Sequence, residues 1–353
     1  MRLFIKCLML LGVSAFYSLP TIAQSDSAQT CSACLCSDDL TPAGVMISHI
    51  HEKNQWMLSY RFMTMNMGSM INGNREIPTS EIFKEYLMSS DNMRMDMHML
   101  MAMYGLSNNL TLMTMLHYNY NKMSMSMLDG THHHHGGEAE QSNSHMKTSG
   151  FGDIKVSALY GIINKGNHQL IISGGISIPL GSIQIKGSAL SMYNGIHFPY
   201  MMQLGSGTWD VNNTLSYLHH TNDISWSSQL SSVIRPGKNS LGYRLGNELT
   251  FNNWLAYQWA RSFSSSIRVE GQALGKIKGE DKTLYKGYEP AANPINYGGR
   301  KAFAYLGTTV FLRGGLLNGQ RLAVEAGLPF YQYLNGPQMK SKATIFATWS
   351  IVF

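Results

Sequence analysis

The sequence predicts an all-β protein, a transmembrane antiparallel up-and-down β-barrel of about 12 strands. Apolar and polar residues alternate with a period of two in many segments, the pattern of strands with two different faces. The last such segment ends the chain at Phe353. Charged residues make up only 14% and hydrophobic residues 44%, while the mean hydropathy is slightly negative. This composition suits alternating strands and argues against a helical membrane protein.

The first 23 residues are expected to be a secretory signal peptide. Arg2 and Lys6 form a positive start, Cys7–Leu19 is mostly apolar, and the small residues around Ala23 suit cleavage after it. Cleavage removes two positive charges, so the formal net charge falls from +6 to +4. This mild basicity forms no patch, so no nucleic-acid partner is expected. No later run reaches about 18 apolar residues, so no transmembrane helix is expected.

The expected domain order is a signal peptide over residues 1–23, a periplasmic segment over 24–55 and an outer-membrane β-barrel over 56–353. The segment 24–55 could thread into the barrel as a plug. It carries three crowded cysteines, and these are candidate zinc or copper ligands: Cys31, Cys34 and Cys36. A second ligand set at the usual zinc spacing is missing, so one disulfide plus a spare thiol is the alternative.

The terminal strand, residues 344–353, gives the clearest pattern. One face carries Ile345, Ala347, Trp349, Ile351 and Phe353. Its ten residues are the right length for one tilted crossing of a bilayer. An apolar row that ends on Phe resembles the signal by which outer-membrane barrels are recognised for insertion, so outer-membrane lipid and the barrel-assembly machinery are expected partners.

The same alternation predicts eleven earlier strands. They fall at about 56–67, 93–104, 110–120, 153–162, 169–178, 209–217, 225–234, 248–259, 265–273, 302–313 and 321–330. With the terminal strand the count is twelve, and an even number returns the chain to the side on which it started. Short and long connections alternate, as periplasmic turns and extracellular loops do. A soluble sandwich would not explain this alternation.

Methionine is the anomaly of the composition. The chain has 25, and 17 of them lie between Met57 and Met127, many as Met-x-Met runs. In a strand each run forms a column of thioethers, which are soft ligands that suit Cu(I) or Ag(I). The residues predicted to face the lumen are Met63, Met65, Met67, Met113, Met115 and His117. The run Met93–Met103 is predicted to face lipid, because Arg94, Asp96 and His98 on its other face belong in water.

Four consecutive histidines lie in the expected loop 122–150, namely His132, His133, His134 and His135. Such a tract binds divalent transition metals such as Cu(II) at least weakly. A polar tract without a metal role is the alternative.

No nucleophile elbow, zinc-protease motif, phosphate-binding loop or dinucleotide fingerprint is found, so the protein is not expected to be an enzyme.

Several segments resemble one family. They are residues 148–160 with Gly150-Phe-Gly-Asp153, residues 203–210, residues 242–248, and residues 44–51 followed by Trp56–Met63. They are similar to strands of the MetA-pathway phenol-degradation or transporter-like outer-membrane proteins, of which this chain looks like a methionine-rich branch. The resemblance implies an outer-membrane barrel with a transport role and brings no catalytic residues. Methionine-rich copper-resistance barrels are a looser likeness, based on the Met-x-Met runs alone.

These observations favour an outer-membrane channel or transporter that handles copper or silver ions through its Met- and His-rich segments. No cofactor is required, and Cu(I), Cu(II) or Ag(I) would be the ligand. A channel for small hydrophobic or aromatic compounds without a metal role is the alternative, and a barrel enzyme is the second alternative. The transported ion or small molecule would then be a further partner.

Overall fold

The computed structural model describes residues 40–128, 141–187, 195, 197–315 and 318–353. The expected signal peptide, the three cysteines of segment 24–55 and the four consecutive histidines of loop 122–150 lie outside these residues. In the described part of the chain no helix has the length and apolarity needed to cross a membrane.

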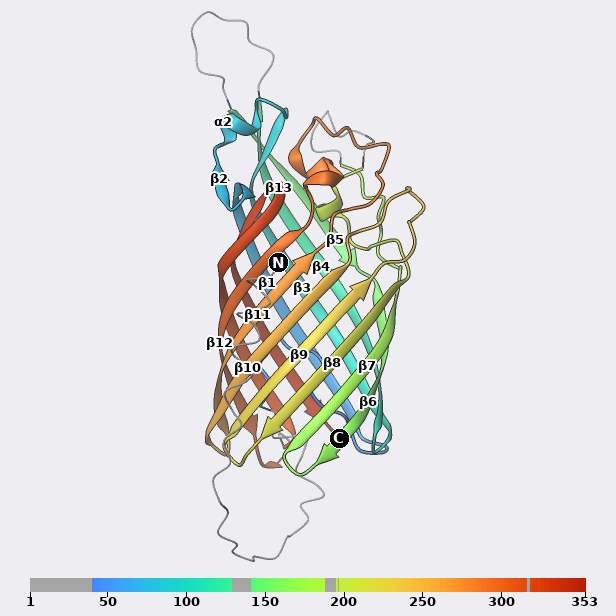
Figure 1. The fold of residues 1–353 in the computed structure, drawn as a ribbon, viewed down its shortest axis with the longest axis vertical. Helices are drawn as coiled ribbons and strands as arrows, with labels where there is room; N and C mark the ends of the chain where they lie inside the picture. Colours follow the sequence, from blue (N-terminus) through green and yellow to red (C-terminus); the bar gives the residue numbers. More distant parts are fainter. Residues whose placement is uncertain (1–39, 129–140, 188–194, 196, 316–317) are drawn as a thin grey trace, which may run out of the picture. The chain divides into compact units, whose positions relative to one another are not determined.

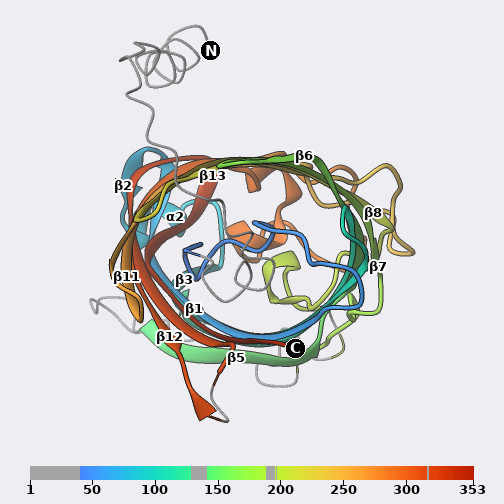
Figure 2. The ribbon, with the colours of Figure 1, turned by 90° about the horizontal axis from the view of Figure 1, so that it is seen from below.

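The strands form one antiparallel sheet that closes into a barrel (Figures 1 and 2), which confirms the predicted fold class. Eleven labelled strands make the closed ring, and β2 and β5 lie outside it. The first seven strands are β1 (Trp56–Gly73), β2 (Arg75–Ile77), β3 (Met88–Ser107), β4 (Leu110–Leu128), β5 (Gln141–Phe151), β6 (Ile154–Lys165) and β7 (His168–Ile178). The others are β8 (Asp210–His220), β9 (Ile224–Ile234), β10 (Glu248–Ala260), β11 (Phe263–Leu274), β12 (Gly299–Leu312) and β13 (Gln320–Val352).

β13 closes the ring and crosses the wall twice. Its residues 320–334 pair with β12, and its residues 334–352 pair with β1. The two limbs meet at their far ends, where the Val352 amide donates to the Gly319 carbonyl at 3.3 Å. The chain reverses at Gly336, whose φ of 103° favours glycine. When β13 is counted twice, the eleven ring strands give twelve crossings, the number predicted from the sequence.

The outer face of the ring is apolar, because alternate residues of each strand point outward. These exposed residues include Leu58, Leu100, Leu112, Tyr160, Ile172, Leu215, Leu230, Leu255, Ile267, Leu306, Leu328 and Trp349. A closed barrel leaves no unpaired strand edge in lipid, so backbone groups are satisfied within the sheet. A barrel with such an outer face is a protein of the Gram-negative outer membrane.

Several strands are longer than the sequence pattern suggested. β3 has 20 residues and β4 has 19, whereas about 9–11 suffice for one crossing. The expected loop 122–150 therefore contains the end of β4 and all of β5 except Phe151. The expected loop 68–92 contains the end of β1, then β2 and the short helix α2 (Thr79–Ile82). In the first of these regions methionine continues to alternate with serine, at Met123, Met125 and Met127.

The long connections gather at the end of the barrel that carries α2 (Figure 1). Three short 3-10 helices lie in them, η2 (Tyr200–Met202), η3 (Pro290–Ala292) and η4 (Pro294–Asn296). The Tyr200 ring packs edge-on against Tyr243, with centroids 4.7 Å apart. His197 Nδ1 lies 2.6 Å from Asp281 Oδ2, which links the connection before β8 to the one before β12. We call these packed connections the loop cap.

Candidate functional site

Three neighbouring strands, β1, β3 and β4, present a continuous methionine surface to the lumen. Residues directly opposite each other in an antiparallel pair lie on the same face of the sheet. Met63 lies opposite Met97, and Met101 lies opposite Met115. We call this surface, with one residue of β5, the methionine wall. It consists of Met57, Met63, Met65, Met67, Met93, Met95, Met97, Met99, Met101, Met103, Met113, Met115, Met123, Met125 and Met146.

The prediction that the run Met93–Met103 faces lipid is wrong. Met99 is 6% exposed, whereas its neighbour Leu100 is 59% exposed. The register is the physical reason. Met63 points inward, and its partner Met97 must lie on the same face, so every second residue of β3 on that side points into the lumen. The wall is therefore continuous, in contrast to the expected mixed arrangement.

Arg94, Asp96 and His98 correspondingly point outward. Arg94 Nε lies 2.9 Å from Asp96 Oδ1, and His98 Nδ1 shares a 2.7 Å hydrogen bond with the Tyr60 hydroxyl. The cost of charge on the outer face falls toward the membrane interface. Arg94 and Asp96 lie in the half of β3 nearer the loop cap, beyond the length needed for one crossing. Mutual pairing and position thus explain how these polar groups are accommodated on this face.

The methionine wall contributes to two buried clusters. The upper cluster lies toward the loop cap, where Met93 and Met123 pack with Phe198 and Met202. The lower cluster contains Met57, Met99, Met101, Met103, Met113 and Met115, and Ile47 and Ile50 pack against it. Met63 and Met97 flank the lower cluster, while Met65 and Met95 flank the upper one, so thioethers continue from one to the other.

Residues 40–51 lie inside the barrel, and we call them the lumen segment (Figure 2). Arg61 of β1 donates to the Val45 carbonyl at 2.6 Å, and Ser216 of β8 donates to the Ile47 carbonyl at 3.0 Å. β1 and β8 lie far apart in the ring order, so the segment spans the lumen. Wall side chains thereby satisfy backbone groups that have no strand partner. The plug role expected for 24–55 stays a prediction.

A buried ion cluster holds one end of the lumen segment. Arg268 of β11 donates to Glu325 of β13 at 2.8 and 3.0 Å, and both side chains are fully buried. Glu325 Oε2 also accepts from the Gly44 amide at 2.7 Å. A Cβ on Gly44 would lie 2.6 Å from that carboxylate oxygen, so a larger residue would have to displace the Arg268–Glu325 pair or the segment. The Arg268 guanidinium stacks 3.8 Å from the centre of the Tyr305 ring.

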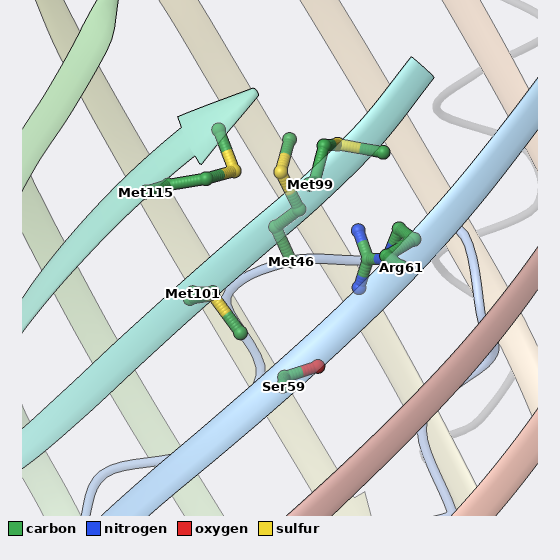
Figure 3. Close-up of a pocket in the computed structure, with 6 residues that line it drawn as sticks. All are labelled: Met46, Ser59, Arg61, Met99, Met101 and Met115. Carbon is green, nitrogen blue, oxygen red and sulfur yellow. The ribbon is translucent and has the colours of Figure 1, made fainter. Parts of the chain in front are cut away.

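A small cavity lies where the lumen segment meets the wall (Figure 3). Its lining residues are Met46, Ser59, Arg61, Met99, Met101 and Met115, and its volume is about 10 Å³. That volume suits one water-sized occupant. Met46 comes from the lumen segment, whereas the other methionines come from β3 and β4. Arg61 is fixed by Val45 and by the Thr348 hydroxyl, 3.2 Å from its Nε.

The candidate ligands named from the sequence divide into two groups. The residues on β1 and β4 point inward as predicted, namely Met63, Met65, Met67, Met113, Met115 and His117, but they spread along the wall instead of forming one site. Cys31, Cys34, Cys36, His132, His133, His134 and His135 lie outside the described residues. Among the side chains that the structure describes, no group of three or more His, Cys, Asp or Glu is arranged to hold a metal.

Sequence reasoning missed two parts of the cavity. Met99 and Met101 stood out as members of a methionine run, but they were assigned to the lipid face. Met46 lies in a segment without strand periodicity, so no pattern in the sequence marked it as a lumen residue. Only the contact of the lumen segment with the wall brings it to Met99 and Met115.

Fold and outer face define the class of this protein as an outer-membrane β-barrel. Models of known families give no match, and no curated protein matches the chain. The structure is similar to an outer-membrane channel from Pseudomonas putida F1, with 15% identity, a TM-score of 0.58, and coverage of 86% of this chain and 97% of that chain. A Pseudomonas aeruginosa FadL homologue shares 9% identity over 85% of this chain and 89% of its own, with a TM-score of 0.39.

Proposed function

We propose that this protein is a passive outer-membrane channel for small hydrophobic or aromatic molecules. The observation that supports this most strongly is the inward face of the methionine wall. Barrel channels generally have polar interiors. Here three neighbouring strands place an apolar strip along the lumen, from the upper to the lower cluster. An apolar molecule can remain in contact with thioethers along that strip instead of crossing a water-filled pore.

Methionine suits such a surface better than a branched residue would. Its side chain is unbranched and flexible, so it can adapt to molecules of different shape. Its sulfur also makes favourable contacts with aromatic rings, worth about 0.3–1.5 kcal/mol each. The similarity to a solved outer-membrane channel and the resemblance to the MetA-pathway family are compatible with this proposal.

Passage requires that the lumen segment moves. Its anchors include hydrogen bonds from the wall to the carbonyls of Val45 and Ile47 and from Gly44 to Glu325, and further bonds hold Thr41, Ala43 and His51. Each such bond contributes only about 0.5–1.5 kcal/mol net, or more where a charged group takes part. The segment can therefore leave without unfolding the barrel, whose strands are paired independently of it.

A passage for Cu(I) or Ag(I) is the second candidate function. It is favoured by the continuity of the methionine wall, because every thioether is a soft ligand. The two candidates differ in what they require of the side chain. An apolar route needs only an apolar surface, whereas an ion route needs sulfur.

The test uses this difference at Met97 and Met99. Uptake of a radiolabelled small aromatic alcohol is measured in cells that express the wild type, M97L/M99L or M97Q/M99Q, with heat-modified gel mobility as the check of folding. The apolar route predicts that the Leu variant keeps uptake and that the Gln variant loses roughly tenfold, equal to about 1.4 kcal/mol. Unchanged uptake in the folded Gln variant, or wild-type uptake no greater than that of cells without the protein, would refute the proposal.

A further inference from the structure

A row of basic residues crosses the outer face of the barrel toward the end that carries the loop cap. Arg94 of β3 lies directly opposite Lys122 of β4, and Lys122 lies directly opposite Lys147 of β5. Partners in an antiparallel ladder share a face, so the three side chains project from the same side of the sheet. All three are exposed. We call these residues, together with Lys342 of β13, the basic row.

Lys342 extends the row past β1. Its Nζ lies beside Gly68 of β1, where a Cβ would be 2.7 Å from that nitrogen. The side-chain oxygen of Asn92 lies 2.5 Å from the same point, and Asn92 is the ladder partner of Gly68. Asn92 precedes Arg94 by two residues, so both lie on the outer face of β3. The positive charges therefore follow one another from β13 across β1 to β3, β4 and β5.

The basic row is unfavourable by itself, because like charges directly opposite each other destabilise a sheet. Arg94 has one compensating contact, the 2.9 Å ion pair with Asp96. The other carboxylate of β3, Asp91, accepts a hydrogen bond from Ser126 at 2.8 Å. Within the described part of the chain, no salt bridge forms at the three lysines of the row. This surplus of positive charge indicates an anion that comes from outside the chain.

The basic row lies at the level where the outer face changes from apolar to polar. Along the outer face of β4, Leu112 is followed by the exposed rings of Tyr118 and Tyr120 and then by Lys122. Aromatic girdles mark the two interfaces of a membrane barrel, and long connections mark its extracellular side. The long connections gather at this end (Figure 1). The row is therefore placed among the headgroups of the outer leaflet.

We propose that the basic row binds the phosphorylated headgroup of lipopolysaccharide, the glycolipid of the outer leaflet. Clusters of about four to eight Lys and Arg residues at a membrane surface attract anionic headgroups. The arginine fork can hold a phosphate through two hydrogen bonds, and each lysine adds a point charge. The acyl chains lie against apolar residues below the girdle, among them Leu100 and Leu112. This site does not depend on what the channel carries.

The experiment measures the affinity of the purified full chain, in detergent micelles, for bisphosphorylated lipid A. K122Q/K147Q should weaken binding about tenfold or more, since each basic residue at a membrane surface adds to the attraction. K122R/K147R keeps both charges and should bind as the wild type does. K53Q/K165Q is the matched control, because it removes two exposed lysines at the opposite end of the barrel and should leave the affinity unchanged.

A thermal measurement separates lipid binding from a purely structural role. Without lipid, K122Q/K147Q should keep its heat-resistant gel mobility to at least the temperature of the wild type, because the substitution relieves repulsion. Addition of lipid A should raise this temperature in the wild type and not in the variant, since a ligand of the folded state stabilises it. K342Q should weaken binding as well, so the row is testable even if the double variant fails to fold.

Three results would overturn the proposal. Wild-type affinity in K122Q/K147Q, or in K342Q if the double variant does not fold, would show that the row is not the site. An equally large loss in K53Q/K165Q would assign the attraction to overall charge. Equal binding of dephosphorylated lipid A, or of phosphatidylglycerol, would show that the row does not recognise the phosphorylated lipopolysaccharide headgroup.

Discussion

Met63 of β1 lies directly opposite Met97 of β3, and both side chains point into the barrel. This pair determines the inner face of two strands at once, because partners in an antiparallel ladder share a face. The same relation passes from β3 to β4 through Met101 and Met115. A lumen surface of methionine follows from the register of three strands. The predictions concern how that surface, the lumen segment and the loop cap behave.

Gly44→Val should open the lumen. The added side chain would collide with the Arg268–Glu325 pair, whose carboxylate oxygen would lie 2.6 Å from the new Cβ. Because that pair is fully buried, we expect the segment to move in preference to the pair. Single-channel conductance in planar bilayers should rise in G44V relative to the wild type. Gly237→Ala is the control, since a Cβ there meets no atom within 4 Å. Equal conductance in G44V and the wild type would mean that the lumen segment does not obstruct the pore.

Glu325→Gln should destabilise the barrel. Both members of the Arg268–Glu325 pair are fully buried, and removal of one partner from such a pair costs about 3–5 kcal/mol. Glu270, 2.6 Å from Arg268, offsets part of this loss. The temperature at which the barrel loses its heat-resistant gel mobility should fall. Asp96→Asn, which breaks an exposed pair, should leave that temperature unchanged. A loss in D96N as large as that in E325Q would contradict the account.

Tyr200 of the loop cap should lose its proton at a higher pH than an exposed tyrosine does. Burial raises the pKa of Tyr200 to about 12. Because the pKa in the folded state lies above the ordinary value of about 10, the protonated phenol stabilises the cap below pH 10, and this contribution is lost as pH rises toward 12. The absorbance difference at 295 nm between the wild type and Y200F should appear near pH 12. A difference that is complete at pH 10.5 would show that the phenol is exposed.

The sequence was sufficient to predict the barrel because period-two alternation survives in every strand. It identified two faces for each strand, yet it did not say which face is inside when both carry apolar residues. On β3 the polar residues Arg94, Asp96 and His98 suggested that their own face is the inner one. They face outward because Arg94 pairs with Asp96 and His98 shares a hydrogen bond with Tyr60. The register with β1, a long-range property, decides the question.

The candidate site was harder to predict than the fold. Its wall residues belong to a visible pattern, but Met46 lies in an irregular segment whose path depends on side chains from strands far away in the sequence. Arg61 and Ser216 fix that path by binding backbone carbonyls, and no local motif reports such contacts. The extension of β4 and β5 beyond the membrane was also hidden, because methionine alternates there with serine as a loop might.

The central claim is that the methionine wall faces the lumen, and paramagnetic broadening tests it most directly. Methionine-methyl 13C spectra are recorded in nanodiscs with and without spin-labelled lipid, and M99L assigns the Met99 signal. Leu100→Met places a methionine on the outer face as an internal reference, because Leu100 is 59% exposed. The account predicts that the signal of the introduced methionine in L100M broadens while Met99 and Met101 stay sharp. Broadening of Met99 and Met101 by the spin-labelled lipid would contradict it.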